Sequence, residues 1–155
     1  GEKTMFYSIG EVANLLKIPP STLRYYDREG LLSTIKRSSG GIRVFSDIEI
    51  GALKVIECLK ASGLQIKDIK QFLDWCDEGD QTLEQRRDMF YERRAVVEKQ
   101  LEELQKTLEV IQYKCWYYDT ACEAGTEDAP RNVTIEDMPE DARKGMAVLG
   151  RSLQV

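Results

Sequence analysis

A long heptad pattern in the second half of this 155-residue chain constrains its fold more than any other feature. Between Thr82 and Gly125 the sequence contains no proline or glycine, and large apolar residues recur every seven positions, with a second series four positions after each. This spacing predicts one helix over about 83–124, roughly 60 Å long at about 1.5 Å per residue. One helix cannot bury such a stripe by itself, so the chain requires a partner surface.

A second copy of the chain is the simplest partner, because two identical stripes related by a two-fold axis cover each other. A helical hairpin within one chain is the alternative, but no second helix of matching length follows. Arg87 and Arg94 stand at stripe positions, so we expect the first two heptads to pack against a head domain. The predicted dimerisation residues, called the seam below, are Val97, Leu101, Leu104, Leu108, Ile111, Cys115 and Tyr118.

Composition excludes several classes of function. Apolar residues make up 42% of the chain and charged residues 32%, and neither a membrane-spanning apolar run nor a secretory signal is present, so we expect a cytoplasmic protein. Histidine is absent, which excludes Ser-His-Asp and Cys-His catalysis and histidine-bound metals. The four cysteines form no C-x-x-C pair. We therefore expect no enzyme, metal or other cofactor; a thiol enzyme without histidine is the remaining catalytic alternative.

Charge is divided unevenly along the chain. Residues 1–46 contain seven Lys or Arg against four Asp or Glu, which gives this segment a net charge of +3. The whole chain has a net charge of −5, so residues 47–155 have a net charge of −8. A basic head joined to an acidic remainder is typical of a DNA-binding module with a separate assembly or sensing region. Random scatter of charge is the alternative explanation.

The basic segment contains signals for two short helices. In "SIGEVANLLKI" Ser8 and Glu11 form a capping box before apolar residues at helical spacing, and the prolines of "IPPS" end that helix near Lys17. A second helix begins at Pro20 or Ser21, and Gly30 ends it. Two short helices joined by a tight turn predict a helix-turn-helix whose second helix reads DNA. The two adjacent tyrosines of "STLRYYDREGLL" point about 100° apart, so at least one faces outward.

A predicted β-hairpin follows in "IKRSSGGIRVFS", where Ser38 to Gly41 supply the turn. Arg37 and Arg43 flank this turn, and arginines on a protruding wing can grip phosphates without reading bases. A surface hairpin with solvated arginines is the alternative. Two helices then follow, one capped by Ser46 and Glu49 and ending at Gly63, the next running from about 66 to 79, and both support the head.

Taken together, "YSIGEVANLLKIPPSTLRYYDREGLL" and "RSSGGIRVFS" resemble the winged helix-turn-helix of the MerR family of bacterial transcription regulators, over roughly residues 6–75. The resemblance implies a homodimer, joined by an antiparallel coiled coil, that binds double-stranded inverted-repeat promoter DNA with RNA polymerase and bends and untwists it. It implies that Arg24 and Tyr25 face DNA, with Tyr26 shared between that face and helix packing. The predicted DNA-binding set is Ser21, Thr22, Arg24, Tyr25, Tyr26, Arg28, Arg37 and Arg43.

Signal input has two candidate sites. Cys58 in "VIECLKASG" resembles the cysteine of the family branch that senses aldehydes and other thiol-reactive electrophiles, although a buried cysteine would be inert. Trp116 and Tyr117 belong to an aromatic cluster that can stack on an apolar ligand, on the tail or in a dimer interface. The cysteine-rich loop of metal-sensing relatives is not evident.

The predicted fold is mainly α. Residues 1–80 form a winged helix-turn-helix head with supporting helices, residues 81–124 a coiled-coil dimerisation helix, and residues 125–155 a short tail that is a possible effector-response segment. The predicted function is a homodimeric, stress- or signal-responsive transcription activator of the MerR type. A coiled-coil interaction protein without DNA binding is the alternative.

Overall fold

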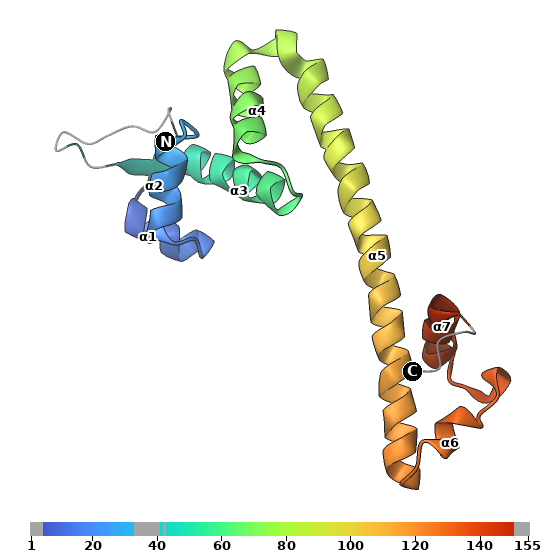
Figure 1. The fold of residues 1–155 in the computed structure, drawn as a ribbon. Helices are drawn as coiled ribbons and strands as arrows, with labels where there is room; N and C mark the ends of the chain where they lie inside the picture. The colour runs from blue at the N-terminus through green and yellow to red at the C-terminus, as the bar shows by residue number, and fades with distance from the viewer. Residues whose placement is uncertain (1–4, 33–40, 42, 151–155) are drawn as a thin grey trace. The chain divides into compact units, whose positions relative to one another are not determined.

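The computed structural model describes residues 5–32, 41 and 43–150. Its elements divide into two compact units, residues 1–94 and 95–155, with the long helix α5 running through both (Figure 1). In chain order the elements are β1 (Phe6–Ser8), α1 (Ile9–Leu16), α2 (Pro20–Arg28), β2 (Val44–Ser46), α3 (Asp47–Ala61), α4 (Ile66–Glu78), η1 (Asp80–Thr82), α5 (Leu83–Ala124), α6 (Asp128–Arg131), η2 (Ile135–Asp137) and α7 (Glu140–Leu149). The predicted mainly α fold is confirmed.

Helices α1 and α2 form as their local sequence signals predict. The hydroxyl of Ser8 accepts a hydrogen bond from the backbone N–H of Glu11 at 3.2 Å, which satisfies one free donor at the start of α1. Helix α2 begins at Pro20, whose fixed φ suits a first helical position. After α2, Gly30 adopts a φ of +81°, which a residue with a side chain rarely takes.

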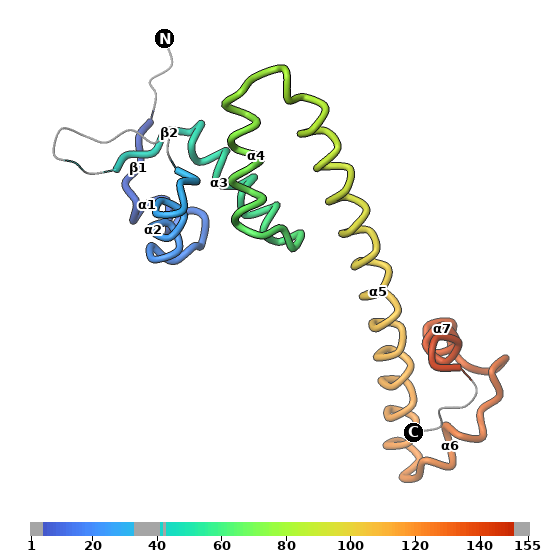
Figure 2. Tube along the Cα trace, turned by 45° about the horizontal axis from the view of Figure 1, so that its top comes forward, coloured from blue at the N-terminus to red at the C-terminus, as the bar shows by residue number. Residues whose placement is uncertain are grey.

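The head contains a two-stranded antiparallel sheet, of which the sequence motifs predict only the second strand. Strand β1 pairs with β2, with Phe6 opposite Ser46, and the two strands lie side by side (Figure 2). Strand β2 is the second strand of the predicted wing. The first wing strand and its turn lie outside the described residues, apart from Gly41. The aromatic pair Phe6 and Tyr7, ahead of the Ser8 cap, is the signal that would have indicated β1.

Helices α3 and α4 contribute a large share of the buried apolar residues of the head core. Ser46 and Glu49 form the predicted reciprocal capping box at the start of α3. Leu53, Ile56 and Leu59 recur on one face of α3 and are almost completely buried. The core is completed by Val12, Ala13, Ile18, Leu23, Tyr26, Leu31, Leu32, Phe45, Ile50, Ile69 and Phe72.

The start of α5 packs against the head through two arginines, Arg86 and Arg93. Arg93 donates to the Ser62 carbonyl at 3.2 Å, and Arg86 donates to the Gly79 carbonyl at 2.9 Å. Arg87 and Arg94 are exposed. Each helical position turns the side chain by about 100°, so the neighbouring residues face the head instead.

The second unit is built on the C-terminal half of α5. Tyr113 and Tyr117 of α5 form a small core with Met138 and Ala142 of the tail. The tail therefore folds back on α5 through α7, although it is too short to match the whole helix (Figure 1).

No helix in the described part of the chain has the length and apolar character needed to cross a membrane.

Candidate nucleic-acid interface

Helix α2 has one buried and one exposed face. Leu23 and Tyr26, three positions apart, have no exposed surface. The opposite face carries four polar or aromatic side chains at helical spacing: Ser21, Arg24, Tyr25 and Arg28 are all exposed, and Thr22 is half-buried beside them. A hydroxyl, two guanidinium groups and a phenol on one short helix form a surface that can donate to base edges and phosphates.

Tyr26 was predicted for both the DNA-facing set and helix packing, and the structure places it wholly in the core. Its hydroxyl donates to the Glu57 carboxylate and accepts from Lys60 Nζ at 3.1 Å. Burial, and then the hydrogen bond to Glu57, raise the pKa of Tyr26 well above the usual tyrosine value. Tyr26 therefore remains a protonated phenol that joins α2 to α3.

Arg43 lies next to α2 rather than projecting from the head. Its guanidinium group forms an ion pair with the Asp27 carboxylate, and its side chain is only 17% exposed. This contact ties the residue before β2 to α2. Arg37, the other predicted wing arginine, lies outside the described residues.

The seam is largely uncovered. Leu101, Leu104, Leu108 and Ile111 are 45–65% exposed and line a shallow groove of about 340 Å³ along one side of α5. Cys115 and Tyr118 continue this exposed stripe, whereas Val97 is half-buried. Single exposed leucines are common, but a row of them on one helix is typical of an interaction surface.

The sensing candidates differ in exposure. Cys58 is exposed on α3. Tyr117 is only 8% exposed, and Trp116 packs against the same tail core. The tail thus covers much of the aromatic cluster that was predicted as a candidate ligand site.

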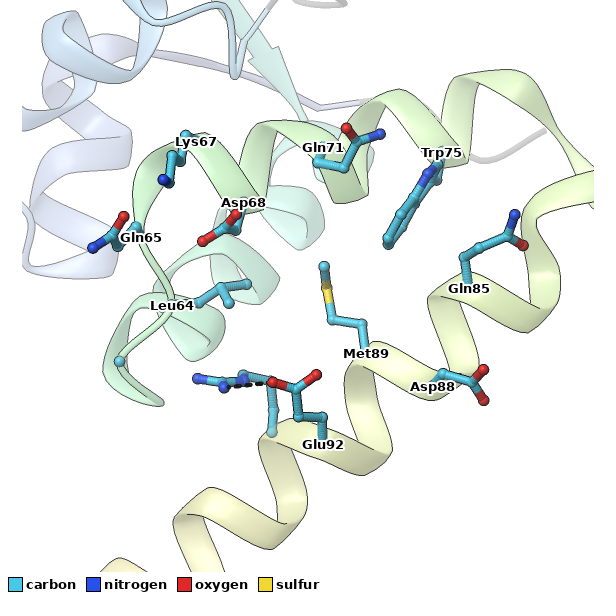
Figure 3. A pocket seen from close by; sticks show the side chains of 12 residues that line it. Leu64, Gln65, Lys67, Asp68, Gln71, Trp75, Gln85, Asp88, Met89 and Glu92 are labelled. Atoms are coloured by element: carbon cyan, nitrogen blue, oxygen red, sulfur yellow. Dashed lines mark hydrogen bonds and ion pairs between the residues drawn. The ribbon is translucent and has the colours of Figure 1, made fainter.

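The head also contains a cavity that sequence reasoning missed. It has a volume of about 720 Å³ and lies between the α3–α4 loop, α4 and the start of α5. Trp75 forms one wall and Met89 points into the space, while Gln71 and Gln85 lie along the sides (Figure 3). The cavity walls come from two segments that are some 20 residues apart in sequence. A cavity between such segments leaves no local sequence motif from which it could be predicted.

Two short helices with an exposed cationic face on the second, a flanking strand and two supporting helices define a helix-turn-helix protein. Residues 7–75 match the sequence profile of the MerR HTH family regulatory protein, and residues 50–113 match that described as MerR, DNA binding. The chain belongs to the MerR family of regulators.

Relatives share both sequence and fold. An uncharacterised HTH-type transcriptional regulator of Haemophilus influenzae is 35% identical over 136 residues, covering 88% of this chain and 98% of the relative. A crystal structure of HiNmlR, a MerR family regulator lacking the sensor domain and bound to promoter DNA, superposes with a TM-score of 0.79, at 35% identity over 87% of this chain and 100% of that one. The crystal structure of a MerR family regulator from Bacillus thuringiensis superposes with a TM-score of 0.67. The two chains are 38% identical, and the match covers 72% of this chain and 97% of that one.

Proposed function

We propose that this protein is a homodimeric transcription regulator of the MerR type that binds double-stranded promoter DNA at an inverted repeat. The observation that carries the proposal is the exposed face of α2, where Arg24 and Tyr25 point away from a core that holds the other side of the helix. HiNmlR, a relative whose whole chain aligns with 87% of this one, is bound to promoter DNA in its crystal structure. A regulator of bacterial promoters acts in the cytoplasm and is not an enzyme.

The exposed seam supports pairing of two chains through α5. A dimer presents two copies of α2 to one duplex, so a two-fold symmetric protein suits an inverted-repeat site. Family resemblance adds RNA polymerase as a partner and bending and untwisting of the promoter as the activating step. Such deformation costs a few kcal/mol, which phosphate contacts can offset.

Substitution of Arg24 tests the DNA-reading role. Arg24→Ala is expected to reduce the preference for the operator over a shuffled duplex about tenfold or more, because a bidentate arginine–base contact is worth ~1–3 kcal/mol. Arg87→Ala removes the same charge from an exposed position on α5 and is expected to leave the preference unchanged. The affinities are measured by fluorescence anisotropy, using the tightest duplex selected from a random library. A wild-type protein that selects no duplex would contradict DNA regulation and favour a coiled-coil interaction protein.

We infer Cys58 as the signal input, since it is exposed on the helix that contacts α2 through Glu57. A thiol-reactive electrophile is expected to change the promoter footprint of the unmodified protein and not that of Cys58→Ser. A footprint that the electrophile leaves unchanged in the unmodified protein would remove this role. The alternative input is an apolar ligand at Trp116 and Tyr117, which would have to displace the tail that packs there.

A further inference from the structure

The hydroxyl of Tyr26 forms two side-chain hydrogen bonds that join α2 to α3. Tyr26 is completely buried, so its hydroxyl has no access to water. An unbonded buried hydroxyl would destabilise the fold, and a phenylalanine would fill the same space without that requirement. The phenol is therefore a directional contact within an otherwise apolar interface.

Two side chains on one face of α3 form hydrogen bonds with the Tyr26 hydroxyl. Glu57 and Lys60 are three positions apart and therefore lie on the same face of α3. The Glu57 carboxylate accepts from the hydroxyl, Lys60 Nζ donates to it at 3.1 Å, and the same Nζ lies 5.3 Å from the centre of the Tyr26 ring. Both partners come from more than 30 residues away in the sequence.

Such a contact restricts how α2 can rotate. Apolar packing of Leu23 and of the Tyr26 ring depends little on direction, whereas a hydrogen bond weakens steeply as its angle and distance change. Helix α2 has only nine residues, and its N-cap is Pro19, whose side chain accepts no hydrogen bond. The bond to α3 therefore supplies an orientation that the helix ends do not.

The orientation of Tyr26 bears on the exposed face directly. The ring centroids of Tyr25 and Tyr26 are 6.3 Å apart. Arg24 and Tyr25 are the two residues that precede Tyr26 in α2. A rotation of α2 by one helical position is about 100°, so even a fraction of it would turn both side chains away from a bound duplex.

We propose that Glu57 and Lys60 are positioning residues for DNA recognition, which hold the Tyr26 hydroxyl and thereby fix the rotation of α2 that presents Arg24 and Tyr25. This inference deepens the proposed function and depends on it. Glu57 and Lys60 need not touch DNA, because they act through Tyr26.

The test separates sequence discrimination from general DNA affinity. Tyr26→Phe keeps the ring and removes no charge, so we expect about a tenfold fall in the preference for the selected duplex over its shuffled version, with affinity for the shuffled duplex and its salt dependence unchanged. Glu57→Gln retains an oxygen acceptor and is expected to keep most of the preference. Lys60→Met is expected to lower the preference, and Lys54→Met, which removes the same charge from an exposed position on α3, is expected to retain it.

Circular dichroism confirms that each variant is folded at the temperature of the binding measurement. An unchanged preference in folded Tyr26→Phe, or an equal loss for both duplexes, would overturn the positioning role while leaving the proposed function intact. A wild-type chain without any preference would overturn the proposed function and this inference together.

Discussion

At the scale of single residues, the head uses its charged and polar side chains for internal contacts as much as for an outer surface. Arg43 and Tyr26 both stand in the motif that resembles DNA-binding relatives, yet the structure pairs one with Asp27 and buries the other against Glu57. Family motifs identify which residues cluster around the recognition helix. They do not distinguish a residue that touches DNA from one that holds its neighbour in place.

The pair of Arg43 and Asp27 predicts opposite effects of two substitutions. If Arg43 leaves Asp27 to bind a DNA phosphate, Arg43→Ala lowers the affinity for every DNA sequence. It also reduces, by about 1, the steepness with which the logarithm of the binding constant falls with the logarithm of the salt concentration. Asp27→Asn removes the competing carboxylate, so it is expected to raise affinity for every sequence several-fold. Anisotropy titrations at several salt concentrations measure both. A loss of affinity in both variants would mean that the pair serves only to hold the wing base against α2.

Tyr26 also predicts a loss of stability at alkaline pH. Its pKa is raised in the folded state, chiefly by burial, so its contribution is complete below the unfolded-state pKa of about 10 and declines as the pH rises toward the folded-state value. One such group lowers the free energy of unfolding by up to about 1.4 kcal/mol per pH unit in that window. Urea unfolding at pH 8 and pH 11 is expected to show a smaller decline for Tyr26→Phe than for wild type. Equal declines would mean that Tyr26 titrates normally.

At the scale of elements, close approach of two helices defines the second unit. Gly145 of α7 lies so near α5 that an added Cβ would stand 2.0 Å from the Glu109 carbonyl oxygen and 2.6 Å from Tyr113 Cβ. Neither atom can move without moving the helix itself. A glycine at this position is therefore required by the packing, although no turn or positive φ demands it.

Gly145→Ala is accordingly expected to displace α7 from α5. The clash is expected to cost at least about 2 kcal/mol, at the upper end for overpacking, and to increase amide hydrogen exchange in α7 and solvent exposure of Trp116. Gly51→Ala on α3 is the matched control, because nothing lies within 4 Å of its added Cβ. Alanine suits a helix better than glycine by roughly 0.5–1 kcal/mol, so the control is expected to be neutral or stabilising. Unchanged exchange in Gly145→Ala would contradict this packing.

At the scale of the whole molecule, α5 carries two apolar faces with different fates. Leu108 belongs to the exposed seam and Tyr113 to the tail core, and five helical positions separate their directions by about 140°. The tail therefore covers one face and leaves the seam open. This division favours a second chain as the partner of the seam.

Substitution of the most exposed seam leucine tests that partner. Burying one leucine is worth about 1.5–3 kcal/mol, and Leu104→Glu removes two from a symmetric dimer, so we expect its dissociation constant to rise at least a hundredfold. Ala95→Glu introduces the same charge nine positions earlier, about 180° around the helix, and is expected to leave the dimer intact. Sedimentation velocity measures both variants. A monomeric wild type at micromolar concentration would contradict dimerisation through the seam.

Oxidative crosslinking of Cys115 can distinguish a parallel from an antiparallel pair of α5 helices in the dimer. Parallel helices would place Cys115 beside its copy, close enough for a disulfide. In an antiparallel pair whose axis passes the middle of the groove, near residue 106, the two Cα atoms would be separated by roughly 27 Å along the helix. We therefore expect mild oxidation to form no Cys115–Cys115 crosslink, while Gln105→Cys crosslinks near the axis. Peptide mapping by mass spectrometry identifies the linked residues, and a Cys115 pair would indicate parallel helices.

The sequence by itself determined the features that depend on neighbouring residues. The bounds of α5, the capping box of Ser46 and Glu49 and the ends at Gly30 and Gly125 follow from local periodicity and backbone preference, which act over one or two helical turns. The predicted 83–124 helix agrees with the structure at both ends.

Only the tertiary structure decided which side chains meet across long sequence distances. The pairing of β1 with β2, the choice of Arg86 and Arg93 for the head contact and the bond from Tyr26 to Glu57 each join segments whose spacing in sequence carries no periodic signal. Such contacts depend on how elements rotate and pack to fill a shared core, and that requires all of the elements to be present together.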